Sequence, residues 1–146
     1  MNNKNLTTDS IVEEIIDEFN FFDDWEEKYA HIIDMGKKLE KMETKLMVED
    51  AKLRGCQSTV YFHSQKESNE KIHFKACSDA AIVQGLIALL LRVYNNRKGI
   101  EILNTSTDFI SKIGLNEHLS VTRKNGLSSM ITVSYTHLTL PTICSV

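Results

Sequence analysis

The chain has 146 residues, of which 42% are hydrophobic and 25% charged, as expected for one globular domain with its own core. Its net charge of −3 supplies no broad basic field, which excludes double-stranded nucleic acid and anionic membrane as default partners and favours a protein or small molecule. The longest apolar run, residues 80–91, is shorter than the roughly 20 residues that cross a bilayer. Residues 1–8 lack the apolar core of a secretory signal, so we expect a cytoplasmic protein with reduced thiols.

Two amphipathic helices are predicted near the N-terminus. Ser10 and Glu13 have the spacing of a capping box, and apolar side chains then recur at intervals near four over residues 11–22. Asp23 or Asp24 can begin a second helix, and Glu27 follows Asp24 by three positions. We expect this helix to end between residues 36 and 39. The stretch 41–49 mixes charged and apolar residues and has no assigned structure.

A β-hairpin is predicted in the middle of the chain. Residues 59–64 and 71–77 have a β-type pattern, and a polar turn separates them. A short strand just before Gly55 would supply a third member, which a small sheet needs for stability.

Helices are predicted after the hairpin. Ser78 or Asp79 can cap a buried helix over residues 80–93. A shorter helix over residues 107–113 stops at Gly114, and a last one begins near residues 124–126. The expected fold class is therefore α+β, with a small antiparallel, three-stranded sheet packed by helices.

The C-terminal tail, residues 134–146, differs from the rest of the chain. It is rich in threonine, holds the only proline, Pro141, and has no Asp, Glu, Lys or Arg. We interpret residues 1–133 as the single domain and the tail as a cloning or assembly scar. A native edge strand or a partner-binding peptide is the competing interpretation.

One cysteine, Cys56, has neighbours that favour chemistry over packing. It follows Gly55, which allows a turn, and Lys52 and Arg54 are close in sequence. Nearby cations favour the reactive thiolate, whereas burial in an apolar pocket would raise the thiol pKa, and the sequence leaves both open. No CxxC or CxxH spacing occurs among the three cysteines, so no metal site is expected.

Several short motifs, separated along the sequence, lie between Asp9 and about Thr132. They are Asp24-Trp25-Glu26 with Tyr29, Met35-Gly36-Lys37, Gly55-Cys56-Gln57-Ser58-Thr59-Val60, Ser78-Asp79-Ala80-Ala81-Ile82-Val83-Gln84-Gly85-Leu86, Gly114-Leu115-Asn116-Glu117-His118-Leu119 and Arg123-Lys124-Asn125-Gly126-Leu127-Ser128-Ser129-Met130. In this order and spacing they resemble the SufE-like family of sulfur acceptors, which work with cysteine desulfurases in iron–sulfur cluster assembly. The chain departs from the family pattern at Tyr61 and Val121, where tryptophan and proline are common.

The resemblance implies a SufE/NifU-like fold and a sulfur carrier that is not an enzyme in its own right. Cys56 would accept persulfide sulfur from a cysteine desulfurase of the SufS or CsdA type, stimulate that enzyme, and pass sulfur to a SufBCD-type scaffold. No cofactor is expected on this chain, because pyridoxal phosphate belongs to the desulfurase. Two alternatives stay open: an iron–sulfur scaffold of the NifU or IscU type, which would need several thiolates together, and a docking module without sulfur chemistry.

Other residues are implied as supporting or partner-binding. Asp79 and Arg123 match the family motifs and are expected near the cysteine loop. Asp79 is equally explained as a helix cap and Arg123 as a solvated residue. Cys77 is either a second thiol near Cys56 or, more simply, a half-buried strand cysteine. The loop residues implied to support Cys56 are Arg54, Gly55, Gln57 and Ser58.

Overall fold

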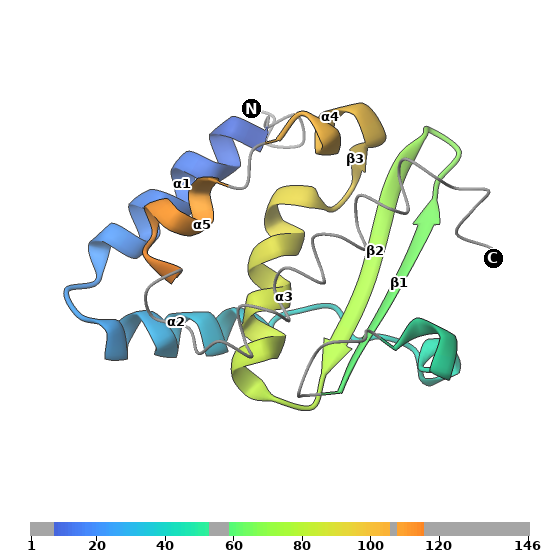
Figure 1. The fold of residues 1–146 in the computed structure, drawn as a ribbon, viewed down its shortest axis with the longest axis horizontal. Coiled ribbons are helices and arrows are strands. Elements are labelled where there is room, and N and C mark those ends of the chain that lie inside the picture. The colour runs from blue at the N-terminus through green and yellow to red at the C-terminus, as the bar shows by residue number, and fades with distance from the viewer. Residues whose placement is uncertain (1–7, 53–58, 106–107, 116–146) are drawn as a thin grey trace.

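The computed structural model describes residues 8–52, 59–105 and 108–115. In chain order they form α1 (Thr8–Phe21), α2 (Trp25–Lys37), the 3₁₀ turns η2 (Thr44–Leu46) and η3 (Glu49–Ala51), β1 (Val60–Lys66), β2 (Lys71–Ser78), α3 (Ala81–Tyr94), β3 (Arg97–Lys98), α4 (Gly99–Leu103) and α5 (Asp108–Lys112). Figure 1 shows α3 between the sheet and the helices α1, α2 and α5. The predicted α+β class with a three-stranded antiparallel sheet is confirmed.

The start of α2 follows from its capping residue. The Asp24 backbone is extended, and its side chain accepts a hydrogen bond from the Glu27 backbone N–H at 2.9 Å. Glu27 in turn accepts from the Asp23 backbone N–H at 3.3 Å. The predicted start of this helix is confirmed, and its end at Lys37 falls in the expected range. The capping box predicted at Ser10 is wrong, because α1 already begins at Thr8.

The sheet has the order β1-β2-β3. β1 and β2 form the predicted hairpin, with a register that runs from Val60 opposite Ser78 to Lys66 opposite Ile72. The third strand is β3, and its two residues pair with the start of β2. Of the strand predicted just before Gly55, the structure describes Lys52, which forms an isolated antiparallel bridge with Tyr61, whereas residues 53–54 lie outside the described part of the chain.

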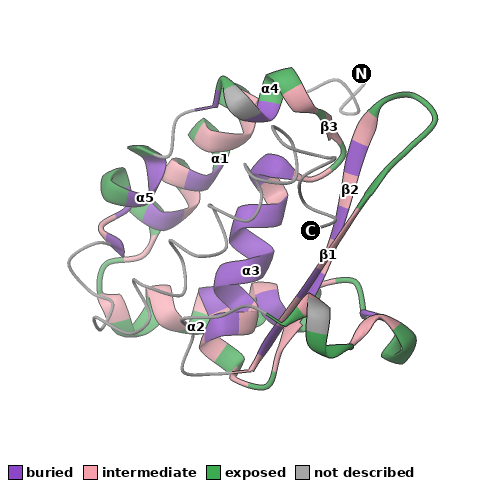
Figure 2. Ribbon diagram, turned by 45° about the vertical axis from the view of Figure 1, so that its right-hand side comes forward, coloured by how far each residue is buried: buried purple, intermediate pink, exposed green. Residues whose placement is uncertain are grey.

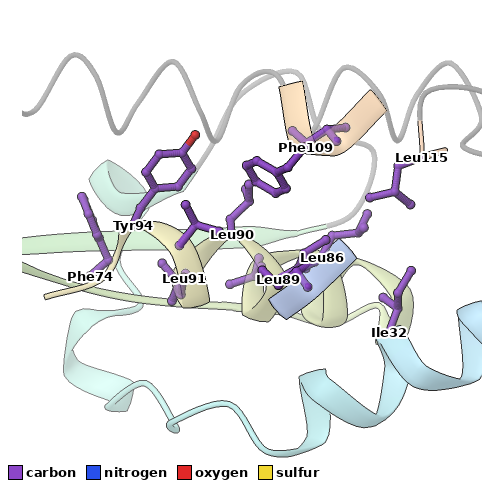
Figure 3. Packing of buried hydrophobic residues seen from close by; sticks show 14 of the residues in the cluster. Ile32, Phe74, Leu86, Leu89, Leu90, Leu91, Tyr94, Phe109 and Leu115 are labelled. Atoms are coloured by element: carbon purple, nitrogen blue, oxygen red, sulfur yellow. The ribbon is translucent and has the colours of Figure 1, made fainter. Parts of the chain in front are cut away.

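Helix α3 is the centre of the core. Ten of its 14 residues are buried, and Figure 2 shows it as the most continuously buried helix. The buried strand residues Val60, Phe62, Phe74 and Ala76 form the apolar face of the sheet that packs with it. Figure 3 shows α3 side chains, among them Leu86 and Leu90, beside Phe109 and Leu115. The pattern of residues 80–93 predicted this buried helix correctly.

Two glycines allow α2 and α3 to cross at very short range. A Cβ placed on Gly85 would overlap the Ile32 carbonyl oxygen, and one on Gly36 would lie 2.7 Å from the Gly85 backbone nitrogen. A larger residue at either position would therefore force the helices apart. Gly36 lies within α2 and has a packing role there.

The other face of the sheet is crossed by the chain between α2 and β1. Met42 is buried there, at 6% exposure. Lys75 Nζ lies 2.6 Å from a Glu43 carboxylate oxygen, and His73 Nε2 lies 3.1 Å from Glu40 Oε1. No structure was predicted for this segment, yet it anchors the outer side of β2.

The last described elements are β3, α4 and α5. α5 matches the short helix predicted before Gly114, which has a φ of +85°, a left-handed conformation that favours glycine. α4 and β3 were not predicted.

No helix in the described part of the chain is long and apolar enough to cross a membrane. The helix predicted from residues 124–126 and the tail, 134–146, lie outside the described residues.

Candidate functional site

Most of the predicted site residues lie outside the described part of the chain. This holds for the cysteine loop and for Arg123. The loop residues concerned are Arg54, Gly55, Cys56, Gln57 and Ser58. Of the predicted site, the structure therefore describes Asp79 and the two residues that flank the loop segment 53–58, which are Lys52 and Thr59.

Asp79 is bonded to the residue that leads from the cysteine loop into β1. Its carboxylate Oδ1 accepts a hydrogen bond from the Thr59 backbone N–H at 3.2 Å. Its own backbone N–H donates to the Thr59 carbonyl at 3.3 Å. These two bonds extend the β1–β2 pairing by one residue beyond Val60 and Ser78.

The helix-cap prediction for Asp79 and Ser78 is wrong. α3 follows Ala80, which lacks a side-chain cap, and the Asp79 carboxylate is directed to Thr59. Ser78 Oγ accepts from the Ala80 backbone N–H at 3.2 Å, and the Ser78 backbone N–H donates to Gln84 Oε1 at 2.8 Å. The turn between β2 and α3 is thus fixed by polar side chains on both sides of Asp79.

The residue on the other side of the loop segment is also attached to β1. Lys52 forms an antiparallel bridge with Tyr61, on the edge of β1 that faces away from β2. In the sequence, Cys56 lies between Lys52 and Thr59, so both described residues that flank its segment belong to the same end of β1.

Cys77 lies on the outer face of the sheet, opposite Tyr61 in the register. It is partly buried, and its Sγ donates to Met42 Sδ at 3.7 Å. Burial raises the pKa of the Cys77 thiol, although a hydrogen bond with the Tyr61 backbone opposes this. The raised pKa favours the protonated thiol, which is the less reactive form. This environment fits the simpler interpretation of a half-buried strand cysteine.

Comparison with known proteins identifies the family. The family model described as "SufE: Fe-S metabolism associated domain" matches residues 13–136. The chain belongs to the SufE family. Membership associates it with iron–sulfur metabolism and confirms the resemblance found in the motifs.

Two curated relatives agree with this assignment. An uncharacterised SufE-like protein of Rhizobium meliloti is 39% identical over 124 residues, which cover 82% of this chain and 89% of the relative. A second, from Rhizobium etli, is also 39% identical over 124 residues, covering 82% of this chain and 84% of the relative. A solution structure of a hypothetical protein from Thermus thermophilus has a TM-score of 0.72 at 17% identity, over 88% of this chain and 93% of that one. At that identity the likeness shows the fold alone.

A charged cluster of this SufE-family chain was not foreseen from the sequence. Arg92 donates from Nη1 and Nη2 to the two carboxylate oxygens of Glu18, at 2.8 and 2.6 Å, and His31 Nε2 lies 2.9 Å from Glu18 Oε1. The hydrogen bonds with Arg92 lower the pKa of Glu18, and the same contact raises the pKa of Arg92. Because 74 residues separate the pair, no local pattern could have revealed it.

Metal-binding side chains do not gather in the described part of this SufE-family chain. Across residues 8–52, 59–105 and 108–115, no group of three or more His, Cys, Asp or Glu side chains is arranged to hold a metal ion.

Proposed function

We propose that this chain is a sulfur acceptor that takes persulfide sulfur from a cysteine desulfurase onto Cys56 and passes it on for iron–sulfur cluster assembly. The observation that carries the proposal is the family match over residues 13–136, which spans the Gly55-Cys56-Gln57-Ser58 motif. Iron–sulfur metabolism needs a form of sulfur that can be delivered without release, and a protein-bound persulfide meets that need.

The proposed transfer is a thiol exchange. The Cys56 thiolate attacks the terminal sulfur of the persulfide on the desulfurase cysteine. A new S–S bond forms at Cys56, the S–S bond of the desulfurase breaks, and its cysteine leaves as a thiolate. One sulfur atom moves and no net oxidation or reduction occurs, so the step requires neither a metal nor a redox cofactor on this chain.

The contacts around the loop support this assignment. The Asp79 bonds to Thr59 and the Lys52 bridge to Tyr61 attach both flanking residues to β1. These attachments hold the described flanks of the Cys56 segment on the rigid sheet. We assign Asp79 a positioning role on this basis, with Arg54, Gln57, Ser58 and Arg123 as supporting or partner-binding residues.

The partner in this proposal is a desulfurase of the SufS or CsdA type, which would carry the pyridoxal phosphate. Removal of its persulfide by this chain would free the enzyme for another turnover and stimulate it. The downstream recipient would be a SufBCD-type scaffold, and the exchange would take place in the cytoplasm. In this role the chain is a carrier and activator and not an enzyme by itself.

Desulfurase turnover tests the proposal. Alanine production from cysteine is measured with the desulfurase alone and with added chain, either unchanged, as Cys56→Ser or as the matched control Cys77→Ser. We expect stimulation by the unchanged chain and by Cys77→Ser, and none by Cys56→Ser. Equal stimulation by Cys56→Ser would favour a docking module. Loss of bound iron in Cys56→Ser, without an effect on turnover, would favour a scaffold.

A further inference from the structure

Gln84, in the first turn of α3, is bonded to the end of the strand that precedes the helix. Its side-chain Oε1 accepts a hydrogen bond from the Ser78 backbone N–H at 2.8 Å, in a partly buried position. Its backbone N–H donates to the Ala80 carbonyl at 2.9 Å. Ser78 is the last residue of β2, so Gln84 ties this strand to α3. Figure 1 shows the turn between β2 and α3 at the same end of the sheet as the start of β1.

The backbone of Gln84 lies in a tightly packed part of the core. It belongs to the close crossing of α2 and α3, where a Cβ on Gly36 would be 2.9 Å from the Gln84 carbonyl carbon. At the next residue, Gly85, a Cβ would overlap the Ile32 carbonyl oxygen. Because backbone atoms packed this closely cannot shift without moving a helix, the Gln84 side chain extends from a fixed point.

Asp79 lies between the two residues that these bonds hold. Ser78 is bonded to Gln84, and Ser78 Oγ accepts a hydrogen bond from the Ala80 backbone N–H at 3.2 Å. Asp79 is bonded to Thr59 through its carboxylate at 3.2 Å and through its backbone N–H at 3.3 Å. A path of hydrogen bonds and adjacent residues therefore connects the core helix to Thr59.

The exposed carboxylate of Asp79 depends on this path for its direction. An exposed side chain can also turn into water, so its place beside Thr59 requires that the adjacent backbone is held firmly. Gln84 supplies that restraint on the Ser78 side.

We propose that Gln84 is a positioning residue for sulfur transfer, which holds Asp79 beside Thr59 through its bond to Ser78. The inference rests on the proposed function, in which Cys56 accepts the sulfur. Gln84 acts in this role through Asp79 and not on the sulfur itself.

The rate of sulfur uptake by glutamine variants tests the proposal. Gln84→Met keeps the length of the side chain and removes the acceptor oxygen, whereas Gln84→Glu retains an acceptor. Gln65→Met is the matched control at an exposed position of β1. The full chain is incubated with a cysteine desulfurase, pyridoxal phosphate and cysteine, and the initial rate of the mass gain at the Cys56 peptide is measured. At saturating desulfurase, we expect Gln84→Met to lower this rate about fivefold and the other two variants to stay within about twofold.

Two further measurements separate positioning from a general loss of stability, with every variant kept well below its Tm. Amide hydrogen exchange at Thr59 should be about fivefold faster in Gln84→Met and should return to the original rate in Gln84→Glu. In the background of Asp79→Ala, Gln84→Met should lower the uptake rate little further, because both residues belong to one path.

Several results would overturn the inference. An uptake rate that Gln84→Met leaves unchanged would do so, as would an equal reduction by Gln84→Glu. A full reduction by Gln84→Met in the Asp79→Ala background would show that Gln84 acts by another route. A chain that gains no sulfur even when unchanged would remove the proposed function and this inference together, whereas sulfur uptake that does not depend on Gln84 would remove this inference alone.

Discussion

Replacement of Gly85 by alanine should separate α2 from α3. The added Cβ would overlap the Ile32 carbonyl oxygen and lie 2.6 Å from the Ile32 side chain. The backbone atom cannot rotate away, so relief requires movement of a helix. Overpacking of this kind costs about 3 kcal/mol at the upper end of its usual range, while alanine regains about 1 kcal/mol of helix propensity.

The expected net loss is about 2 kcal/mol, which for a chain of this length lowers Tm by about 6–7 °C. Circular dichroism melts and urea titrations of the full chain measure both quantities. Asn20→Ala, at an exposed position of α1, is the control. There the alanine changes only the helix propensity, which it raises, so the stability should not fall. An unchanged or raised Tm in Gly85→Ala would refute the close helix crossing.

A second substitution sharpens this test. Gly36→Ala should also destabilise, because its Cβ would meet the Gly85 backbone from the other side. Once one alanine has separated the helices, the other should cost less, so the double variant should be more stable than additivity predicts by at least about 0.5 kcal/mol. Strict additivity would show that the two glycines do not share one contact.

Three further predictions concern polar groups. The contact with Arg92 lowers the pKa of Glu18, so its contribution to stability is present above the ordinary carboxyl pKa of 4.5 and is lost as pH falls through the lower folded value. Urea titrations between pH 7 and 3 should therefore show a smaller acid-induced loss in Glu18→Gln, and an unchanged loss would contradict the pairing. Burial raises the pKa of the Cys77 thiol, so iodoacetamide at pH 8 should react more slowly with Cys77 than with the thiol of free glutathione. The mass of the Cys77 peptide measures the reaction, and a faster reaction at Cys77 would show that its thiol is exposed to solvent. The Asn95 side chain accepts a hydrogen bond from the Phe74 backbone N–H at 2.7 Å and donates one to the Phe74 carbonyl at 3.3 Å. Urea titrations should show that Asn95→Ala lowers the free energy of unfolding by about 1–3 kcal/mol and Asn95→Asp lowers it less. Equal stability of Asn95→Ala and the unchanged chain would argue against the contact.

Local patterns predicted the elements whose signals lie within a few residues of one another. The cap at Asp24, the hairpin alternation and the glycine stop at Gly114 are of this kind. The apolar pattern of α3 predicted the core helix for the same reason.

Features that depend on distant partners were not accessible to these patterns. Gly36 has the local appearance of a helix end, and its packing role depends on Gly85, far along the chain. Asp79 has the local appearance of a helix cap, yet its carboxylate is taken by Thr59 across the sheet. β3 has two residues, both charged, and therefore no apolar alternation to recognise. In each case tertiary contacts override the local signal.

The residues of the candidate site were predicted mainly from the order of the family motifs, and less from the physical properties of their neighbours in the sequence. The structure shows Asp79 bonded to Thr59, the described residue that follows the segment 53–58, and the role of Asp79 at the site stays a prediction. The roles of Cys56 and Arg123 stay predictions, since both residues lie outside the described part of the chain.

The most direct test of the sulfur-acceptor role is the mass of the chain after incubation with a cysteine desulfurase, pyridoxal phosphate and cysteine. The proposal predicts a gain of one sulfur, roughly 32 Da, that maps to the Cys56 peptide, persists in Cys77→Ser and is absent in Cys56→Ser. A chain that gains no sulfur while the desulfurase is active, or gains it equally in Cys56→Ser, would contradict the proposed role.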